Sequence, residues 1–250
     1  MKTQGGLMSQ LKEKEELVSL KVSDQTTMQA YVARPKNPNH RAMIVVQEAF
    51  GVNDYIKDVS RRFADLGYLA IAPEVFHRSA PAGFTGSYTD FSAVMPHMQA
   101  MTIEGLEADL RAAYDFLKQN SAAVSDGIGC VGFCMGGRAA FVANSILPLK
   151  WAISFYGAGI GPSPMGPGLL DRVPKLSAPM LFFWGGKDGH ILPEQTQAVT
   201  QALRKADKPF VNVEFSYADH GFFCDARSNY HPKAAPQAWS LVQSFLQNGA

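Results

Sequence analysis

Hydrophobic positions recur along the chain with two different periods, which predicts strands alternating with helices. Residues 15–22 and 28–35 alternate apolar with polar side chains, a pattern typical of a half-exposed antiparallel hairpin. Residues 42–48 form a short continuous apolar run, which is typical of a strand covered on both faces. The segment 55–66 then has apolar residues at helical spacing and stops at Gly67.

The same alternation continues along the rest of the chain. Strands alternating with helices form a mostly parallel sheet with helices on both faces, so we expect an α/β fold. No linker or repeat separates two cores, and we therefore expect one domain over residues 1–250. Further strands are predicted at 68–74, 128–134, 150–157, 178–186 and 210–219, and further helices at 103–119, 135–147, 194–206 and 236–247.

One cysteine lies where a predicted strand runs directly into a predicted helix. Cys134 is the centre of the sequence GFCMGG, which begins at Gly132 and contains Gly136 on the other side of the thiol. Small residues there relieve the crowding of a sharp strand-to-helix turn, and the positive end of the following helix favours a thiolate. Cys134 is therefore the candidate nucleophile, as in the G-x-S-x-G turn of α/β-hydrolases.

An acid and a histidine follow later strands, in the order that α/β-hydrolases use. Asp188 comes after the strand 178–186, and His220 comes after the last predicted strand. The carboxyl ends of parallel strands meet at one edge of the sheet, so we expect both side chains near Cys134. His190 is the nearest alternative base, but it lies two residues from Asp188 on the same loop and is badly placed for Cys134.

A fourth polar residue is predicted at the same edge. Glu48 ends the strand 42–48, and the loop after it is where α/β-hydrolases find one oxyanion-hole amide. By that rule the backbone N–H groups of Ala49 and Met135 are the two candidate oxyanion donors.

Four motifs together resemble the dienelactone hydrolase family of α/β-hydrolases: QEAFGVND, GFCMGG, GGKD and DHGFF, which lie between residues 47 and 223. The resemblance implies the α/β-hydrolase fold and a Cys134–His220–Asp188 triad. It also implies that Glu48 contacts the cysteine in the resting enzyme. The implied activity is hydrolysis of small esters or lactones through a thioester intermediate.

The segment 77–102 is long for a connection and is expected to be a lid or binding loop. Archetypal members of the family bind a substrate carboxylate with arginines, one of them four residues beyond the histidine. Cys224 stands at that position here, and Arg78 and Arg227 are the nearby arginines that could substitute. The residues expected to contact substrate are Phe50, Arg78, Phe84, Tyr88 and Phe222.

Composition excludes several other classes. The 23 basic and 22 acidic residues are well mixed, which argues against nucleic acid or an anionic membrane as partner. No apolar run reaches about 18 residues, and the first residues lack the apolar stretch of a secretory signal. Three cysteines fit a reducing cytoplasm, and the scattered histidines predict no metal and no cofactor.

Three readings of the candidate site stay open. The first is a cysteine-dependent ester or lactone hydrolase, acting as a monomer or a dimer. The second uses the same nucleophile on phosphotriesters or thioesters, because the turn does not distinguish carbon from phosphorus electrophiles. The third is a non-catalytic relative that binds a small molecule, which the intact set of Cys134, His220 and Asp188 argues against.

Overall fold

The structure is a computed structural model that describes residues 15–120, 124–163 and 166–248. The strands are β1 (Glu15–Lys21), β2 (Thr27–Ala33), β3 (Arg41–Val46), β4 (Leu69–Pro73), β5 (Gly127–Phe133), β6 (Trp151–Phe155), β7 (Met180–Gly185) and β8 (Phe210–Phe215). The helices are α2 (Asp54–Asp65), α3 (Met95–Ala100), α4 (Ile103–Gln119), α5 (Met135–Ile146), the 3-10 helix η2 (Leu170–Lys175), α6 (Pro193–Lys205) and α7 (Ala234–Asn248).

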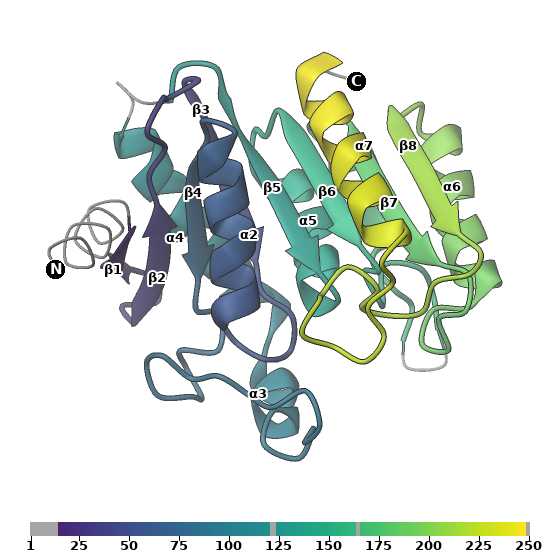
Figure 1. Ribbon diagram of the computed structural model, residues 1–250, viewed down its shortest axis with the longest axis horizontal. Coiled ribbons are helices and arrows are strands. Elements are labelled where there is room, and N and C mark those ends of the chain that lie inside the picture. Colours follow the sequence, from purple (N-terminus) through teal and green to yellow (C-terminus); the bar gives the residue numbers. More distant parts are fainter. Residues whose placement is uncertain (1–14, 121–123, 164–165, 249–250) are drawn as a thin grey trace, which may run out of the picture.

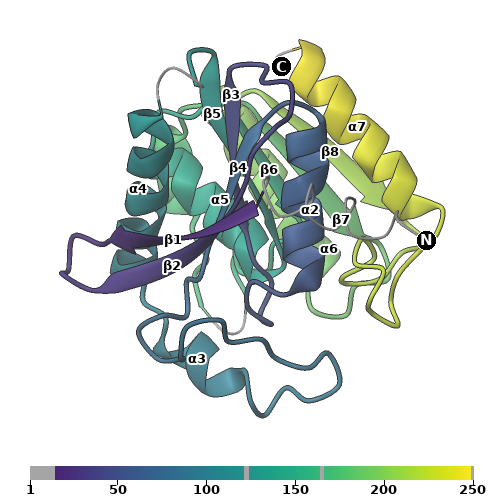
Figure 2. The ribbon, with the colours of Figure 1, turned by 60° about the vertical axis from the view of Figure 1, so that its left-hand side comes forward.

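The strands form an eight-stranded sheet in the order β1-β2-β4-β3-β5-β6-β7-β8. The strands β1 and β2 pair as an antiparallel hairpin, and β2 pairs with β4 in antiparallel register; the remaining pairs are parallel. The helices α2 and α7 lie on one face of the sheet, and α4, α5 and α6 cover the other (Figures 1 and 2). This architecture confirms the predicted α/β-hydrolase fold.

Helix ends follow the capping chemistry of the sequence. Before α2, the Asn53 side chain accepts a hydrogen bond of 3.2 Å from the N–H of Ile56. Before α4, the Thr102 hydroxyl accepts one of 3.0 Å from Gly105. Each cap satisfies one of the backbone N–H groups that a helix leaves unpaired in its first turn.

The boundaries of two predicted strands differ from the sequence interpretation where the site begins. The strand β3 ends at Val46, so Glu48 lies two residues beyond it rather than at its end. The strand β5 ends at Phe133, and Cys134 belongs to the turn. The short helix α3 was not predicted, because none of its six residues is buried and six residues are too few for a helical apolar period to stand out. Among the described residues, no helix combines the length and apolarity needed to cross a bilayer.

Candidate active site

Cys134 occupies a strained turn between β5 and α5. Its backbone has φ 55° and ψ −119°, a left-handed conformation that is uncommon outside glycine. The neighbouring glycines make this turn possible, because a Cβ on Gly132 would overlap the Gly136 carbonyl. A Cβ on Gly136 would in turn overlap the carbonyl oxygens of Val46 and Gln47. The thiol is partly exposed at the N-terminus of α5, as the sequence predicts.

His220 and Asp188 are joined by a short hydrogen bond. The distance between His220 Nδ1 and Asp188 Oδ2 is 2.7 Å, and both side chains are buried. Asp188 is itself held, because its Oδ1 accepts hydrogen bonds from the backbone N–H groups of His190 (2.8 Å) and Ile191 (3.2 Å). The His190 ring packs edge-on against His220, with the ring centroids 5.1 Å apart, so it lies beside the candidate base.

The electrostatics of His220 link it to Cys134. Burial alone lowers the pKa of His220, but the charge of Cys134 and hydrogen bonds to Asp188 and Cys134 raise it to about 10. The imidazolium form is therefore favoured while the sulfur carries a negative charge. Because Nδ1 faces Asp188, Nε2 is the nitrogen left for the sulfur. The structure thus brings together the three residues predicted as a triad.

The loop after β3 packs against the start of α5. Met135 contacts the buried cluster of Ala49, Phe50 and Val94, so the two candidate oxyanion donors come from segments in contact. Within the described residues, the N–H groups of Ala49 and Met135 donate no intramolecular hydrogen bond. Two free amides from these segments are what an oxyanion hole requires.

Glu48 is buried beside this loop and is paired with an arginine rather than with the thiol. Its Oε1 accepts a 3.2 Å hydrogen bond from Arg227 Nη1, and within the described residues its Oε2 meets no partner at good hydrogen-bond geometry. Burial raises the pKa of Glu48, although the charges of Arg227 and His220 oppose this. Arg227 reaches the carboxylate across Gly221, where a side chain would collide with the guanidinium.

The aromatic residues predicted to bind substrate fall into two groups. Phe50 packs edge-on against Tyr88 at 4.6 Å, and its ring lies 5.6 Å from the Arg227 guanidinium, so the 77–102 segment does reach the site. Phe84, which belongs to that segment, packs against the buried cluster of Ala49, Phe50 and Val94. Phe222, by contrast, is fully buried among core rings and contacts Phe215 at 5.4 Å. Its position gives it a packing role.

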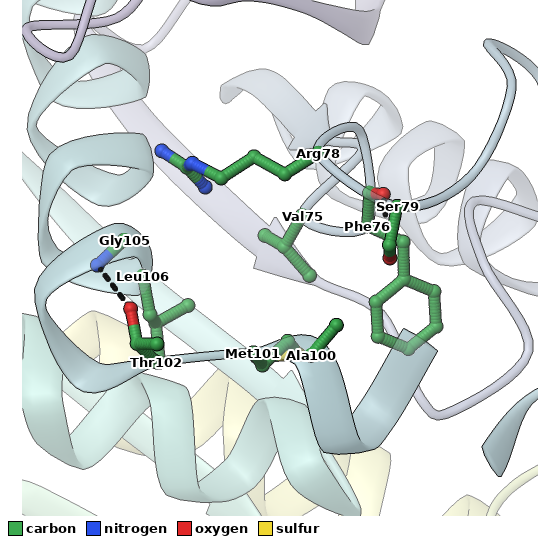
Figure 3. A pocket seen from close by; sticks show the side chains of 9 residues that line it. All are labelled: Val75, Phe76, Arg78, Ser79, Ala100, Met101, Thr102, Gly105 and Leu106. Atoms are coloured by element: carbon green, nitrogen blue, oxygen red, sulfur yellow. Dashed lines mark hydrogen bonds between the residues drawn. The ribbon is translucent and has the colours of Figure 1, made fainter. Parts of the chain in front are cut away.

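Arg78 lies elsewhere. Both terminal nitrogens of its guanidinium donate to the buried carboxylate of Asp109, and its Nε donates to Asp24 at 2.7 Å. Figure 3 shows Arg78 beside a pocket of about 80 Å³ that contains no triad residue. Ligand pockets usually measure at least about 300 Å³, so this one is too small for a substrate. The pocket is lined by Val75, Phe76, Arg78, Ser79, Ala100, Met101, Thr102, Gly105 and Leu106.

Sequence reasoning missed Tyr156, which follows β6 at the same edge of the sheet. Its φ is 37°, its side chain is fully buried, and its ring lies 5.1 Å from His220. A strand end at the edge that carries the triad, followed by Gly157, is the signal that marks this position. Within the described ranges, no group of three His, Cys, Asp or Glu side chains is arranged to hold a metal ion.

Comparison with known sequences identifies the family. The model of the "Dienelactone hydrolase family" matches residues 28–249. A "Putative carboxymethylenebutenolidase" from Synechocystis sp. is 34% identical over 223 residues, which cover 87% of this chain and 90% of the relative. The relative of the same name from Escherichia coli (strain K12) is 35% identical over 231 residues, covering 89% of this chain and 83% of that protein.

Comparison with solved structures gives the same result as comparison with sequences. A "Putative Dienelactone Hydrolase" from Klebsiella pneumoniae subsp. pneumoniae has a TM-score of 0.82 and 31% identity, covering 94% of this chain and 98% of that one. The dienelactone hydrolase-like promiscuous phosphotriesterase P91, from metagenomic libraries, has a TM-score of 0.76 at 19% identity and shares the fold. It covers 94% of this chain and 99% of its own. The chain is therefore a dienelactone hydrolase-like hydrolase and belongs to the dienelactone hydrolase family.

Proposed function

We propose that this protein hydrolyses small esters or lactones through a Cys134–His220–Asp188 triad and a thioester intermediate. The observation that carries the proposal is the 2.7 Å bond between His220 and Asp188, with the Cys134 sulfur interacting with the same imidazole. The name of the relatives, carboxymethylenebutenolidase, points to a lactone as the substrate class.

In the first half-reaction the Cys134 thiolate attacks the ester carbonyl carbon. The oxyanion that forms is held by the free N–H groups of Ala49 and Met135. The carbon–oxygen bond of the leaving group then breaks, and the His220 imidazolium gives its proton to the departing alkoxide. A thioester on Cys134 and a neutral imidazole result, while Asp188 fixes the tautomer of the ring.

In the second half-reaction His220 acts as a base. The charge of Cys134 raises the pKa of His220, and this charge disappears once the sulfur is acylated. The pKa of His220 then falls, so the ring can take a proton from water as the water attacks the thioester. Collapse of the second oxyanion releases the acid and restores the thiolate beside the imidazolium.

The test combines ester hydrolysis with alkylation. We expect wild-type protein to hydrolyse 4-nitrophenyl acetate, and iodoacetamide to abolish this activity in step with modification of Cys134 seen by mass spectrometry. The other two cysteines are internal controls. Both are buried, and burial raises the pKa of Cys130 and brings that of Cys224 to about 12, so both thiols should resist alkylation.

The decisive variant is Cys134→Ala. We expect the alanine variant to lose activity by at least about a thousandfold. Activity equal to that of the wild type would overturn the triad. Complete alkylation of Cys134 in a wild-type protein that turns over neither esters nor lactones would instead indicate a protein that only binds its ligand.

A further inference from the structure

Arg138 lies one helical turn beyond the nucleophile. It is in the first turn of α5, and its backbone N–H lies 3.4 Å from the carbonyl oxygen of Cys134. Four residues span about 6 Å of helix axis, and helical side chains lean toward the N-terminus of their helix. The Arg138 side chain therefore leans toward the sheet edge that carries the triad.

The loop after β6 places the guanidinium at this edge. A Cβ on Gly159, three residues beyond Tyr156, would lie 3.6 Å from both Cδ and Nε of Arg138. The side chain as a whole is only partly buried, so a solute can reach it. Arg138 is thus a cation that lies between the start of α5 and the loop after β6.

Among the residues that the structure describes, this cation has no partner of opposite charge. Its Nε is buried without a hydrogen-bond acceptor, and within the described residues no carboxylate lies within ion-pair distance of its guanidinium. Two neighbouring arginines are paired: Arg172, whose charge acts on Arg138, with Glu107, and Arg227 with Glu48.

An unpaired and partly buried charge is costly to keep. Burial and the charge of Arg172 lower the pKa of Arg138, yet a guanidinium does not lose its proton in proteins. The cost therefore falls on the free protein, and an anionic ligand would offset it. A guanidinium also matches the geometry of a carboxylate, which it can bind through two parallel hydrogen bonds.

We propose that Arg138 is an anion-binding residue beside the active site, and that its ligand is the carboxylate at the far end of the acyl chain of an acidic ester. This subsite is separate from Arg227, which Glu48 already neutralises. The inference rests on the proposed function, because it needs ester hydrolysis at Cys134 as its readout.

Esters that differ in one terminal group provide the test. The probes are the mono-4-nitrophenyl esters of succinic, glutaric and adipic acid, each compared with the neutral ester of equal chain length. For at least one length we expect Arg138→Gln to raise KM for the acidic ester about tenfold or more. The neutral ester should keep its kcat/KM, and Arg138→Lys should retain part of the preference.

Arg111→Gln is the matched control, because it removes the same charge from the exposed face of α4. It should change neither ester. Equal loss with acidic and neutral esters in Arg138→Gln, or no loss with either at any length, would overturn the proposal. Absence of all hydrolysis in the wild type would contradict the proposed function instead, so the two failures are distinguishable.

Inorganic phosphate is the probe that distinguishes a substrate carboxylate from a free anion as the ligand of Arg138. Phosphate could raise the Tm of the wild type but not that of Arg138→Gln, while the ratio of kcat/KM for the acidic ester to kcat/KM for the neutral ester is the same in both proteins. In that case the ligand of Arg138 is a free anion. That result would overturn the assignment to a substrate carboxylate. A changed ester ratio supports it.

Discussion

Arg227 Nη1 donates a hydrogen bond of 3.2 Å to Glu48 Oε1, in a pair whose side chains are 13% and 1% exposed. The pair brings the loop after β3 to the loop after β8 and turns the Glu48 carboxylate toward the guanidinium. In this arrangement Glu48 makes no hydrogen bond with Cys134 among the described residues, although the family resemblance led us to expect that contact. The thiol is accordingly free to interact with His220.

The Glu48→Gln variant should be more stable relative to the wild type at high pH than at low pH. Unfolded Glu48 ionises near its ordinary pKa of 4.5, whereas burial raises the pKa of folded Glu48. Between these two values the folded protein keeps a proton that the unfolded chain has released, so stability falls as pH rises. Each unit of difference is worth about 1.4 kcal/mol.

Urea unfolding from pH 4.5 upward, at steps of about one unit, measures this effect. The Glu48→Gln variant also leaves Arg227 unpaired, which changes its free energy of unfolding by a constant amount but does not change how that free energy varies with pH. The exposed Glu214→Gln is the control for the loss of one carboxylate. A Glu48→Gln curve that ran parallel to that of the wild type would contradict the raised pKa.

The Asp188→Asn variant should lose kcat while it remains folded. Asp188 holds the Nδ1–H tautomer of His220, and an amide can hold the wrong one. We expect kcat to fall on the order of a thousandfold or more, measured with 4-nitrophenyl acetate. The control is Asp219→Asn, because among the described residues Asp219 accepts only the backbone N–H of His220, and the asparagine amide keeps an oxygen for that bond. Equal losses in the two variants would reject the orienting role of Asp188.

Patterns local in sequence predicted most of the fold and which residues lie together at the candidate site. The helix 103–119 was predicted at its observed bounds, because its apolar spacing is a local signal. The proximity of Cys134, His220 and Asp188 followed from strand order, since parallel strands carry their carboxyl ends to one edge.

Pairings between distant residues were outside the reach of such patterns. Arg78 was predicted to bind substrate, but Asp109, 31 residues away in sequence, holds its guanidinium. Asp109 is the one buried acid of α4, and the apolar spacing of that helix does not reveal it. Phe222 lies two residues after His220, and only packing shows that its ring turns into the core. The free charge of Arg138 likewise depends on which acids the fold brings near it.

The Tyr156→Phe variant should be as stable as the wild type or slightly more stable. Within the described residues the buried Tyr156 hydroxyl meets no partner at good hydrogen-bond geometry, and burial and the charge of Glu48 both raise its pKa, so its removal relieves a desolvated group at the loss of weak contacts only. Tyr88→Phe is the matched comparison, because the Tyr88 hydroxyl accepts from Asn53 at 2.8 Å and from Cys224 at 3.4 Å. It should cost about 1 kcal/mol in the free energy of unfolding. A Tyr156→Phe cost equal to that of Tyr88→Phe would mean that the Tyr156 hydroxyl is paired in solution.

The Gly136→Ala variant should disrupt the turn that presents the thiol. A Cβ at this position meets the carbonyl oxygens of Val46 and Gln47, which are backbone atoms of β3 and its loop and cannot turn away as a side chain can. Either β3 or α5 must shift, so we expect a loss of more than about 2 kcal/mol in the free energy of unfolding. Gly189→Ala is the control, because a Cβ there meets nothing within 4 Å and the backbone is not left-handed. That variant should be at least as stable as the wild type. Urea unfolding of both variants measures the difference in stability. Similar free energies of unfolding would show that β3 and the start of α5 are not in close backbone contact at the turn that holds Cys134.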